Sequence, residues 1–244
     1  MEQVPIPVII HDLRGKEKIV DLDTNGLEVL QYGITLQEEF QDDSEEQRAY
    51  YEEVSNFLKK HLNASRVIVY HHVFRVRGPP RTADQCDQTH RNPAFDPHVD
   101  SDSSGIRKKV KEILGEEEAD NVMQNRYQAI NVWRPFGPNA IIDKPLAICD
   151  YRSIDVEKDV HLIELRGSIN TSTAYTITRS TQDTHVWYYL SQMRSNEMFI
   201  FKIFDSKSDV AQFAFHTAFI NENVLPSNVE QKSIELRCFV FYDQ

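Results

Sequence analysis

Residues Ser233–Tyr242, SIELRCFVFY, have the alternating pattern of a β-strand with two unlike faces. Because successive side chains of a strand point to opposite sides, Ser233, Glu235 and Arg237 share one face, and isoleucine, leucine and Cys238 share the other. Many short strands separated by turn signals at intervals of roughly 10 to 20 residues predict an all-β sandwich or barrel. The other strand-like segments of this part of the chain are RYQAINVWRPF (126–136), PLAICD (145–150), DVHLIELRG (159–167), STAYTITRS (172–180), THVWYYLS (184–191), EMFIFKIFDS (197–206) and VAQFAFHTAF (210–219).

The front of the chain mixes helical and strand patterns. Residues 41–63 carry acids at the start, lysines near the end and apolar residues at three- and four-residue spacing, which is typical of an amphipathic helix. The apolar run Val8–Ile10 and the turn signal Asn25–Gly26 predict a small β-hairpin. Residues 65–78 predict a strand, and residues 106–114 predict a second helix.

These patterns together predict a mainly β protein. We expect a double-stranded β-helix core (jelly-roll, cupin-like) with N-terminal and flanking helices. We expect a single domain over residues 1–244, in which residues 1–64 form an α/β cap and residues 65–244 form the jelly-roll core.

Composition excludes several classes of partner and chemistry. The chain has 244 residues and a formal net charge of -11, which disfavours general binding to nucleic acid and to anionic membranes. Three scattered cysteines, no long apolar run and no secretory signal pattern at the start favour a cytosolic protein with reduced thiols. The sequence contains no Gly-rich phosphate loop, no GxSxG and no HExxH.

A metal site is indicated by His98, Asp100 and His216. His98 and Asp100 are two residues apart, so in an extended segment both side chains point the same way. His216 lies in an apolar strand late in the chain, and in a double-stranded barrel a penultimate strand faces the end of an early strand. Two imidazoles and one carboxylate can hold a mononuclear non-haem iron. The alternatives are a solvated turn at His98 and Asp100, and a hydrogen-bonded core histidine at His216.

Arg237 lies on the predicted inward face of the last strand. A buried guanidinium needs an anion, and a dicarboxylic co-substrate supplies one through a bidentate pair. The alternative is a salt bridge to a protein acid such as Asp205 or a neighbour of Glu235.

Three segments carry a resemblance to a known family. NVWRPFGPNAIIDKPLAICDYRSID (131–155), HVWYYLSQMRSNEMFIFKIFDS (185–206) and FHTAFINENVLPSNVEQKSIELRCFVFY (215–242) resemble fungal oxygenases of secondary metabolism. That group is similar to gibberellin desaturase and cephalosporin 7α-methoxylase-related proteins, and it includes meroterpenoid enzymes, one of which forms an endoperoxide. The resemblance covers nearly the whole chain and implies a double-stranded β-helix, Fe(II), 2-oxoglutarate and O2.

Carried over by residue, the resemblance places the iron motif on His98, Asp100 and His216. It places the 2-oxoglutarate arginine on Arg237, and NVWRP adds Asn131 and Arg134. Tyr127 or Asn131 would supply a second hydrogen bond to the co-substrate, a choice that the sequence leaves open. Ser101–Asp102 after the iron motif and YHHVFR (70–75) depart from the usual pattern and bear on substrate choice.

The implied activity is hydrogen abstraction from a small natural product (a terpenoid, meroterpenoid or polyketide), giving hydroxylation, desaturation or endoperoxidation. Trp187, Tyr189, Phe136 and Trp133 are candidate substrate contacts, although strand alternation favours a core position for each, and residues 79–93 are a candidate lid. A homodimer is compatible with the sequence. The alternative functions are a cupin-like metal oxygenase or isomerase that does not use 2-oxoglutarate, and a non-catalytic ligand-binding jelly roll.

Overall fold

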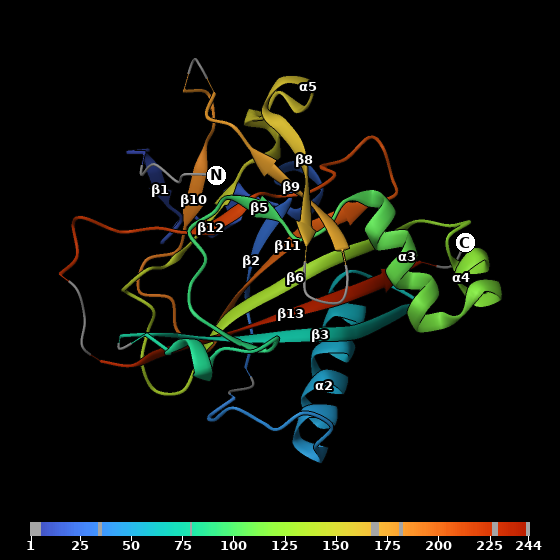
Figure 1. The fold of residues 1–244 in the computed structure, drawn as a ribbon, viewed down its shortest axis with the longest axis horizontal. Coiled ribbons are helices and arrows are strands. Elements are labelled where there is room, and N and C mark those ends of the chain that lie inside the picture. Colours follow the sequence, from blue (N-terminus) through green and yellow to red (C-terminus); the bar gives the residue numbers. More distant parts are fainter. Residues whose placement is uncertain are drawn as a thin grey trace.

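Two β-sheets face each other and form the body of the protein (Figure 1). The computed structural model describes residues 6–33, 36–78, 80–166, 171–180, 183–225 and 229–242. The six-stranded sheet has the order β2 (Leu27–Gln31), β11 (Glu197–Asp205), β6 (Tyr127–Phe136), β13 (Gln231–Phe241), β3 (Arg66–Arg77) and β4 (His90–Arg91). The seven-stranded sheet has the order β1 (Ile10–Asp12), β10 (Trp187–Tyr189), β7 (Leu146–Cys149), β12 (His216–Ala218), β5 (His98–Val99), β9 (Thr171–Ile177) and β8 (Val160–Arg166).

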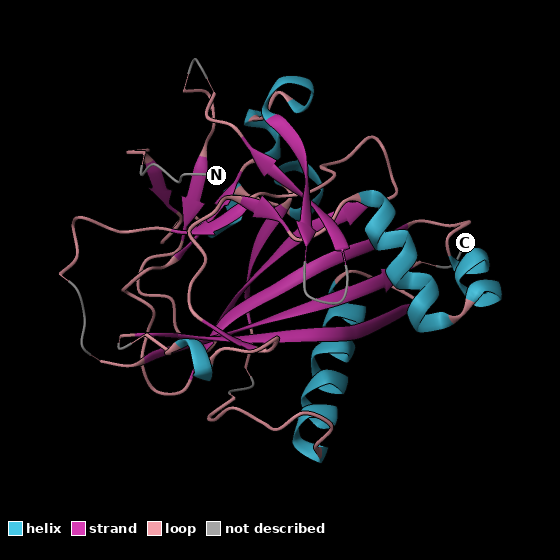
Figure 2. Ribbon diagram, viewed as in Figure 1, coloured by secondary structure: helices cyan, strands magenta, loops and turns pink. Residues whose placement is uncertain are grey.

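The helices lie outside the two sheets, as the colouring of Figure 2 shows. The longest described helix packs against the outer face of the six-stranded sheet and buries Tyr50, Val54 and Leu58 there. The α-helices are α1 (Leu22–Asn25), α2 (Glu45–His61), α3 (Ser103–Leu114), α4 (Glu116–Val122) and α5 (Val156–Asp159), and the short 3-10 turns are η1 (Glu17–Ile19), η2 (Ala83–Gln85) and η3 (Tyr151–Ser153). None of the helices within the described residues has the length and apolarity that crossing a membrane requires.

Three apolar clusters form the core. One lies between α2 and the six-stranded sheet, and each of the other two draws residues from both sheets. The predicted fold class, a mainly β jelly roll with N-terminal and flanking helices, is confirmed. The alternation predicted for the last strand is also present, because Ile234, Leu236 and Cys238 belong to the α2 cluster.

The predicted N-terminal hairpin is wrong. β1 pairs in parallel with β10 in one sheet, whereas β2 pairs with β11 in the other. The turn signal Asn25–Gly26 instead ends α1, where Gly26 has a φ of 83°. A glycine with positive φ serves a helix C-cap as readily as a hairpin turn, so the dipeptide alone does not separate the two.

Two other segments differ from their predictions. Of the segment 210–219, only His216–Ala218 forms a strand, and α4 follows α3 where no helix was predicted. The candidate lid is attached to the six-stranded sheet, because β4 pairs with β3 at its edge. A capping box between Thr82 and Gln85 further orders this segment. Pro79 lies outside the described residues.

Candidate metal centre

Neighbouring strands of the seven-stranded sheet bring His98, Asp100 and His216 together. His98 in β5 lies directly opposite His216 in β12, because these two residues are paired in antiparallel register. Asp100 follows β5 by one residue, so its side chain returns to the face that His98 occupies. One ligand atom from each of the three residues lies within 4.8 Å of the others. His98 Nε2 is 3.8 Å from Asp100 Oδ1, and His216 Nε2 is 3.9 Å from Asp100 Oδ2.

Both imidazoles direct Nε2 toward this cluster. His98 Nδ1 lies 2.6 Å from the carbonyl of Asp96, and His216 Nδ1 lies 3.5 Å from the carbonyl of Ala214. A ring nitrogen that faces a carbonyl carries the proton, so Nε2 of each ring is left with its lone pair. His216 Nε2 is buried and makes no hydrogen bond with any described residue. A cation between the three side chains would satisfy this buried nitrogen, so the donor set fits a metal ion.

Asp100 is held on both oxygens. Asn131 Nδ2 donates to Oδ2 at 2.7 Å, and Arg237 Nη2 donates to Oδ1. Burial opposes ionisation of Asp100, but Arg237, His216, His98 and the Asn131 amide outweigh it and lower the pKa of the carboxyl. Burial, aided by His98, lowers the pKa of His216 to about 3. The cluster therefore contains a carboxylate and a neutral imidazole at neutral pH, which are the protonation states that metal binding requires.

A partly open cavity lies beside the cluster. The wall includes His98 and His216 from the seven-stranded sheet, and Arg75, Arg77 and Trp133 from the six-stranded sheet.

The chain matches a family profile described as "Oxidoreductase/YMDC permease-like domain" over residues 1–241. The chain belongs to this family. Two curated relatives of this oxidoreductase domain are the hydroxylase/desaturase CTB9 of Cercospora beticola and the Fe(II)/2-oxoglutarate-dependent dioxygenase nvfI of Aspergillus novofumigatus. CTB9 is 29% identical over 97% of this chain and 76% of the relative, and nvfI is 28% identical over 97% of this chain and 84% of the relative.

A solved structure has the same fold. The W199F variant of the iron and alpha-ketoglutarate-dependent endoperoxidase NvfI superposes with a TM-score of 0.82 at 25% identity. The match covers 96% of this chain and 83% of that chain. The fungal oxygenase resemblance that the sequence motifs carry is therefore confirmed over nearly the whole chain.

Arg237 and Asn131 lie beside the candidate metal ligands, and both donate hydrogen bonds to Asp100. Arg237 Nη2 is bonded to Asp100 and lies 3.6 Å from Glu235 Oε1, so its charge is compensated by protein carboxylates. Asn131 uses its amide donor on Asp100, and its Oδ1 is buried without a hydrogen-bond partner among the described residues. Both side chains are therefore placed to orient the carboxylate of Asp100, the candidate metal ligand.

Arg134 and Tyr127 are not placed to hold a co-substrate. Arg134 alternates with Asn131 and Trp133 along β6, so it points to the outer face, where it lies 4.6 Å from the ring of Tyr32. Tyr127 shares the inner face with Asn131 but lies four residues away, roughly 13 Å along the strand. Its ring is 3% exposed and packs in the apolar core.

Only Trp133 of the four candidate substrate contacts lines the cavity. Phe136 points outward from β6 into the cluster beneath α2. Trp187 pairs with Cys149 of β7, whereas His216 pairs with the adjacent Ile148. Alternation therefore places Trp187 and Tyr189 on the face opposite His216, and Trp187 is a core residue there.

Arg75 and Arg77 are cavity residues that the sequence analysis did not single out. Both lie on β3 and line the cavity. Their signal is present in the sequence VFRVRG (73–78), where two arginines alternate with apolar residues. In a strand whose other face is buried beneath a helix, this alternation places the arginines inside the barrel.

Proposed function

We propose that this protein is a non-haem Fe(II)/2-oxoglutarate-dependent dioxygenase that oxidises a small natural product. The observation that carries the proposal is the meeting of His98, Asp100 and His216, with the buried Nε2 of His216 directed at the other two ligands. Two imidazoles and one carboxylate leave several positions of a ferrous ion open, which is the arrangement that O2 and a keto acid need. Relatives named as dioxygenases of this type support it.

The ferrous ion would supply the oxidative chemistry, and the chain supplies placement. In a hydroxylation, 2-oxoglutarate loses CO2 and takes one oxygen atom of O2 to become succinate, while the second oxygen atom enters the product. Asn131 and Arg237 fix the Asp100 carboxylate, and the two backbone carbonyls fix the imidazoles. Such outer partners keep metal ligands oriented and tune their basicity.

The proposed substrate class follows from the relatives. The relatives include a hydroxylase/desaturase and an endoperoxidase from fungi, which supports a terpenoid, meroterpenoid or polyketide of secondary metabolism as substrate. We place the co-substrate in the cavity beside His98 and His216, and the natural product next to Pro93 and Ala94, which also line it.

Succinate formation tests the proposal. The purified protein should release succinate from 2-oxoglutarate when Fe(II) and O2 are present, slowly without substrate and faster with the right natural product. His98→Ala, Asp100→Ala and His216→Ala should each reduce this release by ~10²-fold or more, because each removes a metal ligand. Thermal unfolding of each variant is the control for folding.

Two results would replace the proposal. Metal-dependent turnover without 2-oxoglutarate would indicate a cupin-like metal oxygenase or isomerase. Absence of both metal binding and succinate would indicate a ligand-binding jelly roll.

A further inference from the structure

Arg77 is a buried cation without an acidic partner among the described residues. Its side chain is 2% exposed, its Nε donates to the carbonyl of Lys144 at 2.9 Å, and its Nη1 donates to Ser233 Oγ at 2.8 Å. Its Cζ lies 5.4 Å from the ring centroid of Trp133. All three contacts are with neutral groups, and no ion pair among the described residues involves Arg77. Asp143, which attracts it from a distance, is paired with Lys144.

Burying a guanidinium whose contacts are with neutral groups costs folding free energy unless an anion binds beside it. Burial and the neighbouring Arg75 lower the pKa of Arg77 to about 9, which is the effect expected of an uncompensated charge. Arg77 lines the same cavity as His98 and His216. The free space therefore connects the candidate metal ligands to a cation that has no counterion in the described part of the chain.

Arg237 is in the opposite situation. It lies between two buried acids, because its Nη2 is bonded to Asp100 and lies 3.6 Å from Glu235 Oε1. It is also not among the residues that line the cavity. A carboxylate ligand that took Arg237 would have to compete with Asp100, the candidate metal ligand.

The interior charge favours a dianion. Three arginines (Arg75, Arg77 and Arg237) outnumber the two carboxylates (Asp100 and Glu235) that face this part of the barrel. A ferrous ion would add two further positive charges. A ligand with one carboxylate for the metal and a second for an arginine is therefore the complementary one.

We propose that Arg77, oriented by Ser233 and Trp133, binds the carboxylate of 2-oxoglutarate that is remote from the metal, and that Arg237 is a positioning residue for Asp100. This inference rests on the proposed function. Arg75 is the competing cation of the cavity. It is more exposed than Arg77 and donates to the carbonyl of Asn92 at 2.7 Å, near the rim formed by Pro93 and Ala94.

Binding of two keto acids to the Mn(II)-loaded protein, measured by calorimetry without turnover, tests the assignment. 2-Oxopentanoate has the carbon chain of 2-oxoglutarate but lacks the remote carboxylate. The wild-type protein should prefer 2-oxoglutarate by ~30-fold or more, and Arg77→Gln should remove most of this preference, because one partner of a buried charge pair is lost. A purely structural role of Arg77 would not change the ratio of the two affinities.

Variants of the other arginines distinguish their roles from that of Arg77. Arg237→Gln should weaken Mn(II) binding by ~10-fold or more, yet keep the preference once Mn(II) is saturating. Arg75→Gln should reduce the preference less than Arg77→Gln does. Arg134 is a buried arginine on the outer face of the six-stranded sheet, so Arg134→Gln is the matched control and should keep the preference. If Arg77→Gln does not fold, Arg77→Lys and Ser233→Ala carry the test, and each should reduce the preference several-fold.

Two outcomes overturn the inference alone. The first is a wild-type preference that persists in Arg77→Gln or, if that variant does not fold, in both Arg77→Lys and Ser233→Ala. The second is a preference abolished by Arg237→Gln at saturating Mn(II), or by Arg75→Gln. A wild-type protein that binds neither Mn(II) nor 2-oxoglutarate would instead contradict the proposed function.

Discussion

At the scale of single residues, the meeting of His98, Asp100 and His216 was predictable from the sequence, and the contacts of their neighbours were not. The HxD spacing and an isolated histidine in an apolar strand are local patterns, and the structure brings these three side chains together. Alternation within NVWRPF (131–136) would already have separated Arg134 and Phe136 from Asn131. The pairing of Arg237 with Asp100 depends on how the two sheets face each other, which alternation along one strand does not specify.

Asn131 offers a test of how the carboxylate is oriented. Asn131→Leu keeps the volume but removes the 2.7 Å hydrogen bond to Asp100 Oδ2, so one constraint on the metal carboxylate is lost. We expect Mn(II) affinity to fall by ~10-fold, in the range found for outer partners of metal ligands. Stability should change little, because the lost hydrogen bond is offset by removal of the buried Oδ1, which has no partner among the described residues. Equal Mn(II) affinity in the variant and the wild type would contradict this role.

At the scale of elements, hydrophobic periodicity located α2, β3, β6, β11 and β13 within a few residues of their bounds. These elements have long buried faces, so the pattern persists over several turns or pleats. The short strands of the seven-stranded sheet were harder, because three residues carry too little alternation to fix an end or a register. The register of β10 on β7 places Trp187 on the face opposite His216.

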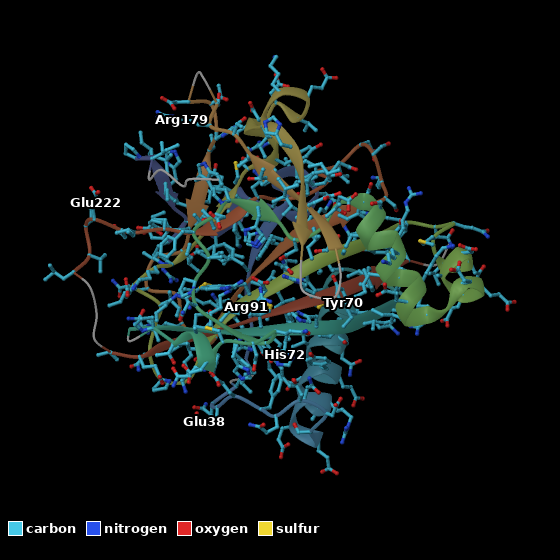
Figure 3. The ribbon with its side chains drawn as sticks, in the orientation of Figure 1. Glu38, Tyr70, His72, Arg91, Arg179 and Glu222 are labelled. Atoms are coloured by element: carbon cyan, nitrogen blue, oxygen red, sulfur yellow. The ribbon has the colours of Figure 1, made fainter. Side chains whose placement is uncertain are left out.

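A buried histidine at the interface of α2 and β3 should make the free energy of unfolding depend on pH. His72 is 2% exposed, lies beside α2 as Figure 3 shows, and its Nδ1 is 2.8 Å from Tyr51 Oη. Burial lowers the pKa of His72, although Asp42 opposes this. The unfolded chain therefore binds a proton more readily than the folded chain does. The contribution of His72 to the free energy of unfolding is complete above the ordinary pKa of about 6.5, and it is lost as the pH falls below that value.

His72→Asn should isolate this effect, since asparagine offers an acceptor to Tyr51 and does not titrate. Between pH 7 and pH 5, the wild-type protein should lose more unfolding free energy than the variant. One histidine of ordinary pKa can contribute at most about 2 kcal/mol at pH 5. Urea unfolding at several pH values measures the difference, and parallel curves for the two proteins would argue against it.

At the scale of the whole molecule, the first 64 residues are built into both sheets. β1 extends the seven-stranded sheet, β2 extends the six-stranded sheet, and α2 covers its outer face. The buried Lys202 adds a polar link, because its Nζ contacts Asp205 at 2.6 Å and Asp23 of α1 at 2.9 Å. Removing this segment would expose the outer apolar face and leave Lys202 with one acid fewer.

We therefore expect the chain to unfold as one cooperative unit. Calorimetry of the full chain should show a single transition, and residues 65–244 alone should show none, because the cluster beneath α2 would be open to water. A fragment of residues 65–244 that melts cooperatively would show that the cap and the jelly-roll core are separable.

The central claim is that His98, Asp100 and His216 bind one ferrous ion that accepts 2-oxoglutarate. Anaerobic titration of the protein with Fe(II) and 2-oxoglutarate, followed by visible absorption, tests it most directly. A keto acid chelated to Fe(II) gives a charge-transfer band, which should saturate at an equimolar amount of Fe(II) and be missing from His216→Ala. No band in the wild-type protein, or an undiminished band in His216→Ala, would contradict the claim.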